Sequence, residues 1–94
     1  MKASRLLKER SAVDVDSFVE LSVWKVPTPV RGSEHTFKYS LAFVVSGQCV
    51  LRYDNEQGKG DHRHIGEVEE PYEFSSAEQL IADFWADVDK WRST

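Results

Sequence analysis

Apolar and polar residues alternate along most of the chain before residue 55, a pattern typical of β-strands with one buried face. The alternation is most regular over 35–45, where every second side chain is large and apolar. The pattern predicts strands over residues 5–13, 17–26, 35–45 and 48–54. A shorter run at 62–68 adds a strand if it is also extended, so the sheet is expected to have four to five strands.

The second of these strands has apolar side chains on both faces. Val19, Leu21 and Val23 share one face, whereas Phe18 and Trp24 share the other. This pattern indicates a central strand, or a strand whose second face is covered.

The Ser46-Gly47 dipeptide predicts a tight turn between the third and fourth strands. With a two-residue turn, Leu41 lies opposite Arg52, and Tyr39 lies opposite Asp54. Arg52 and Asp54 then point to the same face as the aromatic side chains. A longer loop would change the register and move both to the opposite face.

The segment 76–92 has the spacing of an amphipathic helix. Ser75 or Ser76 is the expected N-cap, and Glu78 or Gln79 completes a capping box. A single apolar stripe is formed by Leu80, Ile81, Phe84, Trp85, Val88 and Trp91. This stripe is expected to pack on the sheet.

Strands followed by one helix predict an α+β fold. We expect a mostly antiparallel sheet with the C-terminal helix packed on one face. Trp24, Trp85 and Trp91 are expected to lie between the sheet and the helix. The chain has 94 residues, enough for one hydrophobic core, so residues 1–94 are expected to form a single domain.

The charge of the chain is acidic overall but unevenly distributed. Its formal net charge is −4, which argues against a general nucleic-acid coat. Residues 1–10 nevertheless hold four bases and one acid, whereas residues 67–89 hold many acids and no base. A local basic patch that meets a phosphate backbone is therefore compatible with the acidic total.

The sequence also bears on the cellular compartment. No apolar run approaches the roughly 20 residues that cross a bilayer, and the N-terminus lacks the features of a signal peptide. Cys49 is the only cysteine, so no disulfide framework is expected. These features favour the cytoplasm and indicate neither a membrane partner nor a cofactor.

The segment 52–66, RYDNEQGKGDHRHIG, is rich in glycine, charge and histidine. His62 and His64 are two residues apart, so an extended chain places both imidazoles on one face. Such a pair suits general acid–base chemistry near neutral pH. It also suits a metal, but zinc sites use three or four protein ligands, and we predict none here. Two histidines on a solvated strand are the simplest alternative.

The middle of this segment permits two interpretations. The glycines of Gly58-Lys59-Gly60 allow close approach to a phosphate, but they equally suit a hairpin tip, and P-loop spacing is absent. Asp54 either caps a turn or orients a histidine. Tyr39 and Tyr53 are the tyrosines that could stack on a base. The predicted substrate contacts are Tyr53, Asn55, Gly58 and Gly60.

Together these residues suit a ribonuclease that needs no metal. One group removes the 2′-OH proton, another protonates the leaving oxygen, and cations hold the charge that develops on the phosphate. His62 and His64 are predicted to be the acid and the base. The other predicted catalytic residues are Arg52, Asp54, Lys59 and Arg63. A binding module without catalysis, which docks a protein or a nucleotide, and a metal-dependent hydrolase remain open.

The sequence resembles the TumE family of small bacterial toxins. The resemblance rests on RYDNEQGKGDHRHIG at 52–66, EEPYEF at 69–74 and QLIADFWADVDKW at 79–91, and it covers nearly the whole chain from 18 onward. It implies a toxin that acts inside a bacterial cell and pairs with a helix-turn-helix antitoxin. RNA is the target that small toxins of this kind suggest. A homodimer is also plausible, because a small open sheet leaves edge strands to protect.

Overall fold

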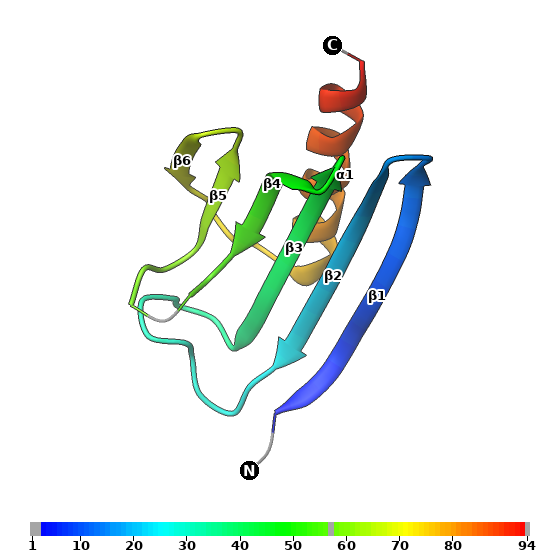
Figure 1. Cartoon of the computed structure of the whole chain (residues 1–94). Helices are drawn as coiled ribbons and strands as arrows, with labels where there is room; N and C mark the ends of the chain where they lie inside the picture. The colour runs from blue at the N-terminus through cyan, green and yellow to red at the C-terminus, as the bar shows by residue number, and fades with distance from the viewer. Residues whose placement is uncertain (1–2, 57, 94) are drawn as a thin grey trace.

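The computed structural model describes residues 3–56 and 58–93. Lys2, one of the four N-terminal bases, and Gln57, within the predicted site segment, lie outside the described residues. The chain forms one six-stranded antiparallel sheet in which sequential strands are neighbours, with a helix across one face (Figure 1). The elements are β1 Ser4–Asp14, β2 Ser17–Lys25, β3 Phe37–Val45, β4 Gln48–Asp54, β5 His62–Ile65, β6 Val68–Pro71 and α1 Ala77–Arg92.

The predicted α+β class, with one C-terminal helix on an antiparallel sheet, is confirmed, but the prediction of four to five strands is wrong. The extra strand arises because the run at 62–68 is broken by a two-residue turn. Gly66 takes a φ of +62° there, which glycine adopts readily. Pro71 ends the edge strand β6, a position where its missing N–H is tolerated.

The core lies between the sheet and α1. Alternate residues of the central strands point toward the helix, which contacts β3 and β4. The buried core consists of Val19, Leu21, Val23, Tyr39, Leu41, Phe43, Leu51, Tyr53, Leu80, Phe84 and Val88. Trp85 packs against this cluster. Trp24 does not, because Val23 takes the helix-facing position, and the prediction that Trp24 lies against the helix is wrong.

The helix begins directly after Ser76, one of the two residues predicted as its N-cap. Ser76 Oγ accepts a hydrogen bond of 3.0 Å from the Gln79 N–H. Within the predicted apolar stripe, the buried residues are Leu80, Phe84 and Val88. No helix within 3–56 and 58–93 is long and apolar enough to cross a membrane.

The β3–β4 hairpin determines which face Arg52 and Asp54 take. Ser46 and Gly47 form the expected two-residue turn, with φ values of +50° and +79°. A β-bulge then leaves Val50 without an opposite residue on β3, so the register between β3 and β4 moves by one residue. Arg52 and Asp54 therefore point away from the helix, and the prediction that they share the aromatic face is wrong.

Candidate functional site

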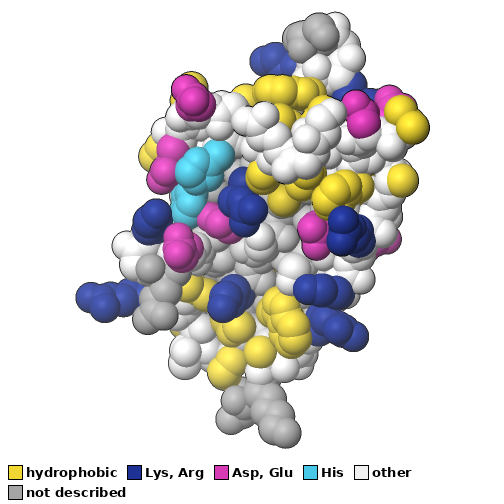
Figure 2. Space-filling view, viewed as in Figure 1, with side chains coloured by type: hydrophobic (Ala, Val, Ile, Leu, Met, Phe, Trp, Pro, Cys, Tyr) yellow, Lys and Arg dark blue, Asp and Glu magenta, His cyan; other side chains and the backbone are white. Residues whose placement is uncertain are grey.

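The face of the sheet opposite α1, here called the open face, carries two rows of side chains that run across all six strands. The strand registers align the first row as Arg10, Glu20, Ala42, Arg52, His64 and Glu69. They align the second row as Lys8, Ser22, Ser40, Asp54, His62 and Pro71. Figure 2 looks onto this face and shows histidines beside basic and acidic side chains, with further Lys and Arg side chains across the sheet.

Four of the predicted site residues meet on β4 and β5. Arg52 lies directly opposite His64, and Asp54 lies directly opposite His62. Strand alternation puts both histidines on one face, and the bulge in β4 turns Arg52 and Asp54 to that same face. The open face therefore gathers a cation, a carboxylate and two imidazoles.

His62 is the buried member of this group, with 5% of its surface exposed. Its Nδ1 lies 3.0 Å from the carbonyl oxygen of Gly60, and its Nε2 lies 2.6 Å from Asp54 Oδ1. The second contact has the distance of an ion pair but not the alignment of a hydrogen bond, because Asp54 Oδ1 has no hydrogen-bond partner among the described residues. Both ring nitrogens thus face oxygens of the protein, which holds the ring in place.

His64 is the accessible histidine, since about a third of its side chain is exposed (34%). Its Nε2 lies 3.5 Å from Glu69 Oε2, and its ring meets the His62 ring edge-on with centroids 5.2 Å apart. Glu69 was not among the predicted site residues. The glycine at 66 could have indicated it, because a two-residue turn there pairs residue 64 with residue 69.

These side chains also define the place where a metal could bind. One ligand atom each from His62, His64 and Glu69 lie within 4.8 Å of one another. Two imidazoles and one carboxylate match the ligand types of zinc sites with an open position. The contact of His62 with the Gly60 carbonyl resembles the outer contacts that orient histidine ligands.

Arg63 and Tyr53 point to the other side of the sheet, toward α1. Arg63 Nη1 lies 3.2 Å from the Tyr53 hydroxyl and 3.1 Å from Asp87 Oδ2, while Arg63 Nε donates to Glu70 at 2.6 Å. Its hydrogen bond to Tyr53 raises the pKa of Arg63. Tyr53 is fully buried. The structure therefore does not bring these two predicted site residues to the histidines.

Burial is also the main cause of the raised pKa values of the three tyrosines. The pKa values of Tyr39, Tyr53 and Tyr72 are all raised, first by burial and next by a hydrogen bond to a carboxylate. These carboxylates belong to Asp61, Asp87 and Asp83 respectively. Each tyrosine therefore acts as a neutral donor inside the fold, and Tyr39, at 3% exposed, offers no surface on which a base could stack.

The loop at 55–61 is bound to the loop at 26–36. The Gly58 N–H donates to the Arg31 carbonyl at 2.7 Å, and the Lys59 N–H donates to the Glu56 carbonyl at 3.0 Å. These amides are thus used inside the protein. The Lys59 side chain is exposed and lies 3.6 Å from a Glu56 carboxylate oxygen.

The closest approach of these loops is between two glycines. A Cβ on Gly60 would lie 2.9 Å from the Gly32 carbonyl oxygen. A Cβ on Gly32 would lie 2.7 Å from the Gly60 nitrogen. Both residues also have positive φ values. Glycine is therefore required here for loop packing, whatever else the loop does.

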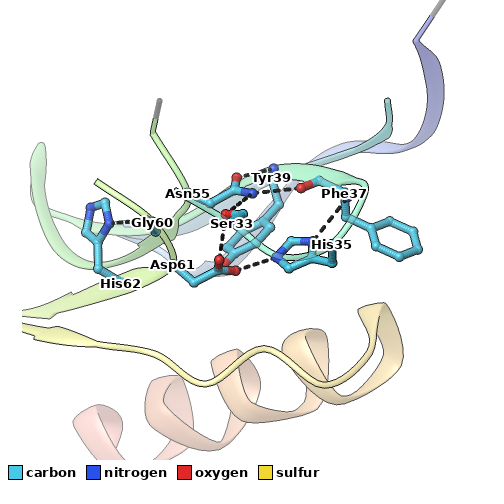
Figure 3. A network of polar contacts seen from close by, with 8 residues as sticks. All are labelled: Ser33, His35, Phe37, Tyr39, Asn55, Gly60, Asp61 and His62. Carbon is cyan, nitrogen blue, oxygen red and sulfur yellow. Dashed lines mark hydrogen bonds and ion pairs between the residues drawn. The ribbon is translucent and has the colours of Figure 1, made fainter. Parts of the chain in front are cut away.

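Asn55 joins the same two loops from inside and is only 1% exposed. Its Oδ1 accepts from the Tyr39 N–H at 3.0 Å, and its Nδ2 donates to the Phe37 carbonyl at 2.7 Å and to Ser33 Oγ at 3.2 Å (Figure 3). The amide therefore satisfies backbone groups of β3, and its side chain has no surface to offer a substrate.

Asp61 is the centre of the polar network in Figure 3. It accepts from Ser33 Oγ at 2.6 Å, from the Tyr39 hydroxyl at 2.7 Å and from His35 Nε2 at 2.6 Å. His35 Nδ1 accepts from the Phe37 N–H, which places the ring proton on Nε2. Ser33 and His35 thus both bond Asp61 rather than each other, unlike the order of a nucleophilic triad.

Two shallow hollows extend the open face beyond the histidines. The first, of about 410 Å³, lies between β1 and β4, with Lys8 and Arg10 on one side and Arg52 on the other. The second, of about 390 Å³, contains Trp24 and Lys38. Both hollows share the small side chains of Ser22 and Ser40 as lining.

Comparison with known proteins now adds to this geometry. A family model described as Toxin TumE matches residues 2–92. The chain belongs to the TumE toxin family. It is therefore a toxin of a toxin–antitoxin system, and its partner is an antitoxin. No significant match was found among curated proteins or among solved structures.

The open face of this TumE toxin offers three accessible groups in one row. Arg52 can hold an anion, His64 can exchange a proton, and the Glu69 carboxylate lies beside His64. His62 and Asp54 lie behind them and are largely buried. This arrangement suits chemistry on a phosphate group more than binding through the glycine loop, where the Gly58 and Lys59 amides already donate to backbone carbonyls.

Proposed function

We propose that this TumE toxin cleaves RNA without a metal ion, with Arg52, His64 and Glu69 as the reacting groups. The observation that carries the proposal is the register of β4, β5 and β6, which puts these three side chains next to one another on the open face. A phosphate held by Arg52 would lie beside an imidazole and a carboxylate. Metal-free transfer of the phosphate requires such groups.

The proposed reaction uses the 2′-OH of the RNA as the nucleophile. The Glu69 carboxylate takes the 2′-OH proton as the 2′-oxygen attacks phosphorus. The bond from phosphorus to the 5′-oxygen breaks, and protonated His64 gives its proton to that leaving oxygen. The products are a 2′,3′-cyclic phosphate and a free 5′-OH, and Arg52 holds the charge on the phosphate oxygens throughout.

His62 and Asp54 act as positioning residues in this proposal. His62 is buried, and both of its ring nitrogens face protein oxygens, so it holds β5 in place. His64 is two residues further along the same strand. Both histidines were predicted to transfer protons, and only His64 is accessible enough to do so.

The test is cleavage of a labelled single-stranded RNA by purified toxin freed of its antitoxin. His64→Ala should lower the rate about 10²- to 10⁴-fold, the usual range for loss of an acid–base group. Arg52→Ala should lower it by about 10²-fold. Lys90→Ala, which removes a positive charge from α1 on the other side of the sheet, is the matched control and should leave the rate unchanged.

A chelator separates the proposal from its alternatives. Cleavage that persists in EDTA supports the metal-free reaction. Cleavage abolished by EDTA would instead assign His62, His64 and Glu69 to a metal site. RNA binding without cleavage in either condition would leave the open face as a binding module.

The proposal also concerns the partners of the toxin. It places the toxin in the cytoplasm, where RNA is available, with an antitoxin that carries a helix-turn-helix domain. A homodimer would pair the exposed edge strand β1, Ser4–Asp14, whose backbone groups face no neighbour on one side. Light scattering of the purified toxin tests the dimer, and a monomer at all concentrations would remove it.

A further inference from the structure

We propose that the open face binds single-stranded RNA across its strands, with Trp24 stacking on one base and Lys8 and Arg10 each contacting a phosphate. This inference rests on the proposed function, because it extends the substrate from the reacting phosphate at Arg52 and His64 to its neighbours. The two hollows described above are the binding surface.

The first hollow has the shape and charge of a phosphate site. Its base is formed by small side chains, since Ser22, Ser40 and Ala42 occupy the central strands where the rows cross β2 and β3. Lys8 and Arg10 on β1 face Arg52 on β4 across this base. A backbone that lies in the hollow would therefore meet cations on both sides.

The cations of this hollow are only partly neutralised by the protein. Glu20 lies opposite Arg10 and is the acid next to it in the row. Arg10 also lies over the Phe18 ring, 4.2 Å from its centroid, which steadies the guanidinium above the face. Lys8 lies opposite the uncharged Ser22. Three bases, Lys8, Arg10 and Arg52, line the hollow with two acids, Glu9 and Glu20, so positive charge exceeds negative charge by one.

Trp24 provides the stacking surface in the second hollow. It is half-buried on the open face, outside the core, and its Nε1–H donates to Ser22 Oγ at 3.1 Å. That bond fixes the ring relative to the sheet. Lys38 lies directly opposite Trp24 and adds a cation at the same place. An aromatic ring beside a basic side chain is the usual composition of single-strand sites.

The dimensions of the face fit a short single strand. From β1 to β4 there are three strand intervals, which span about 14 Å at about 4.8 Å per interval. Bases of a duplex are paired and stacked on one another, so only a single strand can place a base on Trp24.

Binding is measured first, on the His64→Ala toxin, which keeps the RNA intact. Fluorescence anisotropy with a labelled single-stranded decamer gives the affinity at several salt concentrations. For single strands the slope of log affinity against log salt changes by about 0.7 for each phosphate contact. A Lys8→Ala, Arg10→Ala double change should therefore reduce the slope by about 1.4. Lys90→Ala should leave it unchanged.

Stacking has a different signature. Trp24→Ala should weaken affinity roughly 5- to 150-fold without changing the salt slope, because stacking involves no counterion release. Trp24→Phe should restore most of the affinity. The inference is overturned if the double cation change leaves the slope unaltered, if Trp24→Ala binds like the parent, or if a duplex binds as tightly as the single strand.

Cleavage then separates this inference from the proposed function. A dinucleotide reaches only the reacting groups Arg52, His64 and Glu69, so the Lys8→Ala, Arg10→Ala toxin should cleave it at the parent rate while it cleaves the decamer more slowly. Equal loss on both substrates would overturn the inference and leave the ribonuclease proposal standing. Normal decamer binding with no cleavage by wild type would reject the ribonuclease and keep the binding surface.

Discussion

Replacing Asn55 with alanine tests whether this residue holds the fold together or contacts substrate. The change removes an acceptor from the Tyr39 N–H and a donor from the Phe37 carbonyl, both inside the protein. Each buried group left without a partner costs about 1–3 kcal/mol, so the two together cost about 2–6 kcal/mol. Domains of this size have total stabilities of about 5–15 kcal/mol, so Asn55→Ala should lose a large fraction of the free energy of unfolding.

The assay is urea unfolding followed by tryptophan fluorescence, with Asn55→Asp as the matched comparison. The aspartate variant keeps an oxygen for the Tyr39 N–H but loses the donor to the Phe37 carbonyl. Protonation of the new carboxyl restores a donor, so this variant should gain stability relative to wild type as the pH falls. Asn55→Ala should show no such gain.

The result also decides the role of Asn55 in function. Below the unfolding transition, RNA cleavage per folded molecule should be the same in Asn55→Ala and wild type. A loss of less than about 1 kcal/mol, below the cost of a single orphaned group, would refute the structural reasoning. Weakened substrate binding at unchanged stability would restore Asn55 as a substrate contact.

Three further predictions follow from the loop, the tyrosines and the histidines. Gly60→Ala should destabilise more than Gly58→Ala in thermal unfolding, because both have positive φ but only the first new Cβ meets a backbone oxygen, at 2.9 Å. All three tyrosines have raised pKa values, so their contribution to stability should be constant below a pH of about 10. Above that pH, stability should fall by up to about 1.4 kcal/mol per pH unit for each tyrosine, measured by urea unfolding; a flat profile from pH 10 to pH 12 contradicts this. Zinc should inhibit RNA cleavage by occupying His62, His64 and Glu69, EDTA should reverse the inhibition, and zinc-insensitive cleavage would count against that site.

The sequence was sufficient to predict the first four strands and the helix, because burial of one face imposes the alternation directly, but it did not separate β5 from β6. It was insufficient for the face of Arg52. In the apolar run Cys49-Val50-Leu51, either Val50 or Leu51 can point toward the helix. Only the bulge at Val50 decides between these two registers. His62 and His64 needed no such decision, since their shared face follows from alternation within one strand.

The loop residues were harder to interpret for a different reason. Asn55 and Gly60 owe their roles to contacts with Phe37 and Gly32, which lie more than 17 positions earlier in the chain. No local pattern reports a contact of that kind. Asn and Gly at a strand end suit a turn, a ligand site or a tertiary contact equally well, and only the folded chain separates these roles.

The order of the strands has a consequence for how the toxin is made. Each strand pairs with the strand before it in the sequence, so the sheet can grow one hairpin at a time as the chain leaves the ribosome. The open face needs only the strands, all of which precede Ala77–Arg92 in the chain. The opposite face stays uncovered until that helix arrives. A nascent chain that still lacks the helix therefore leaves this apolar surface in water and is prone to aggregation.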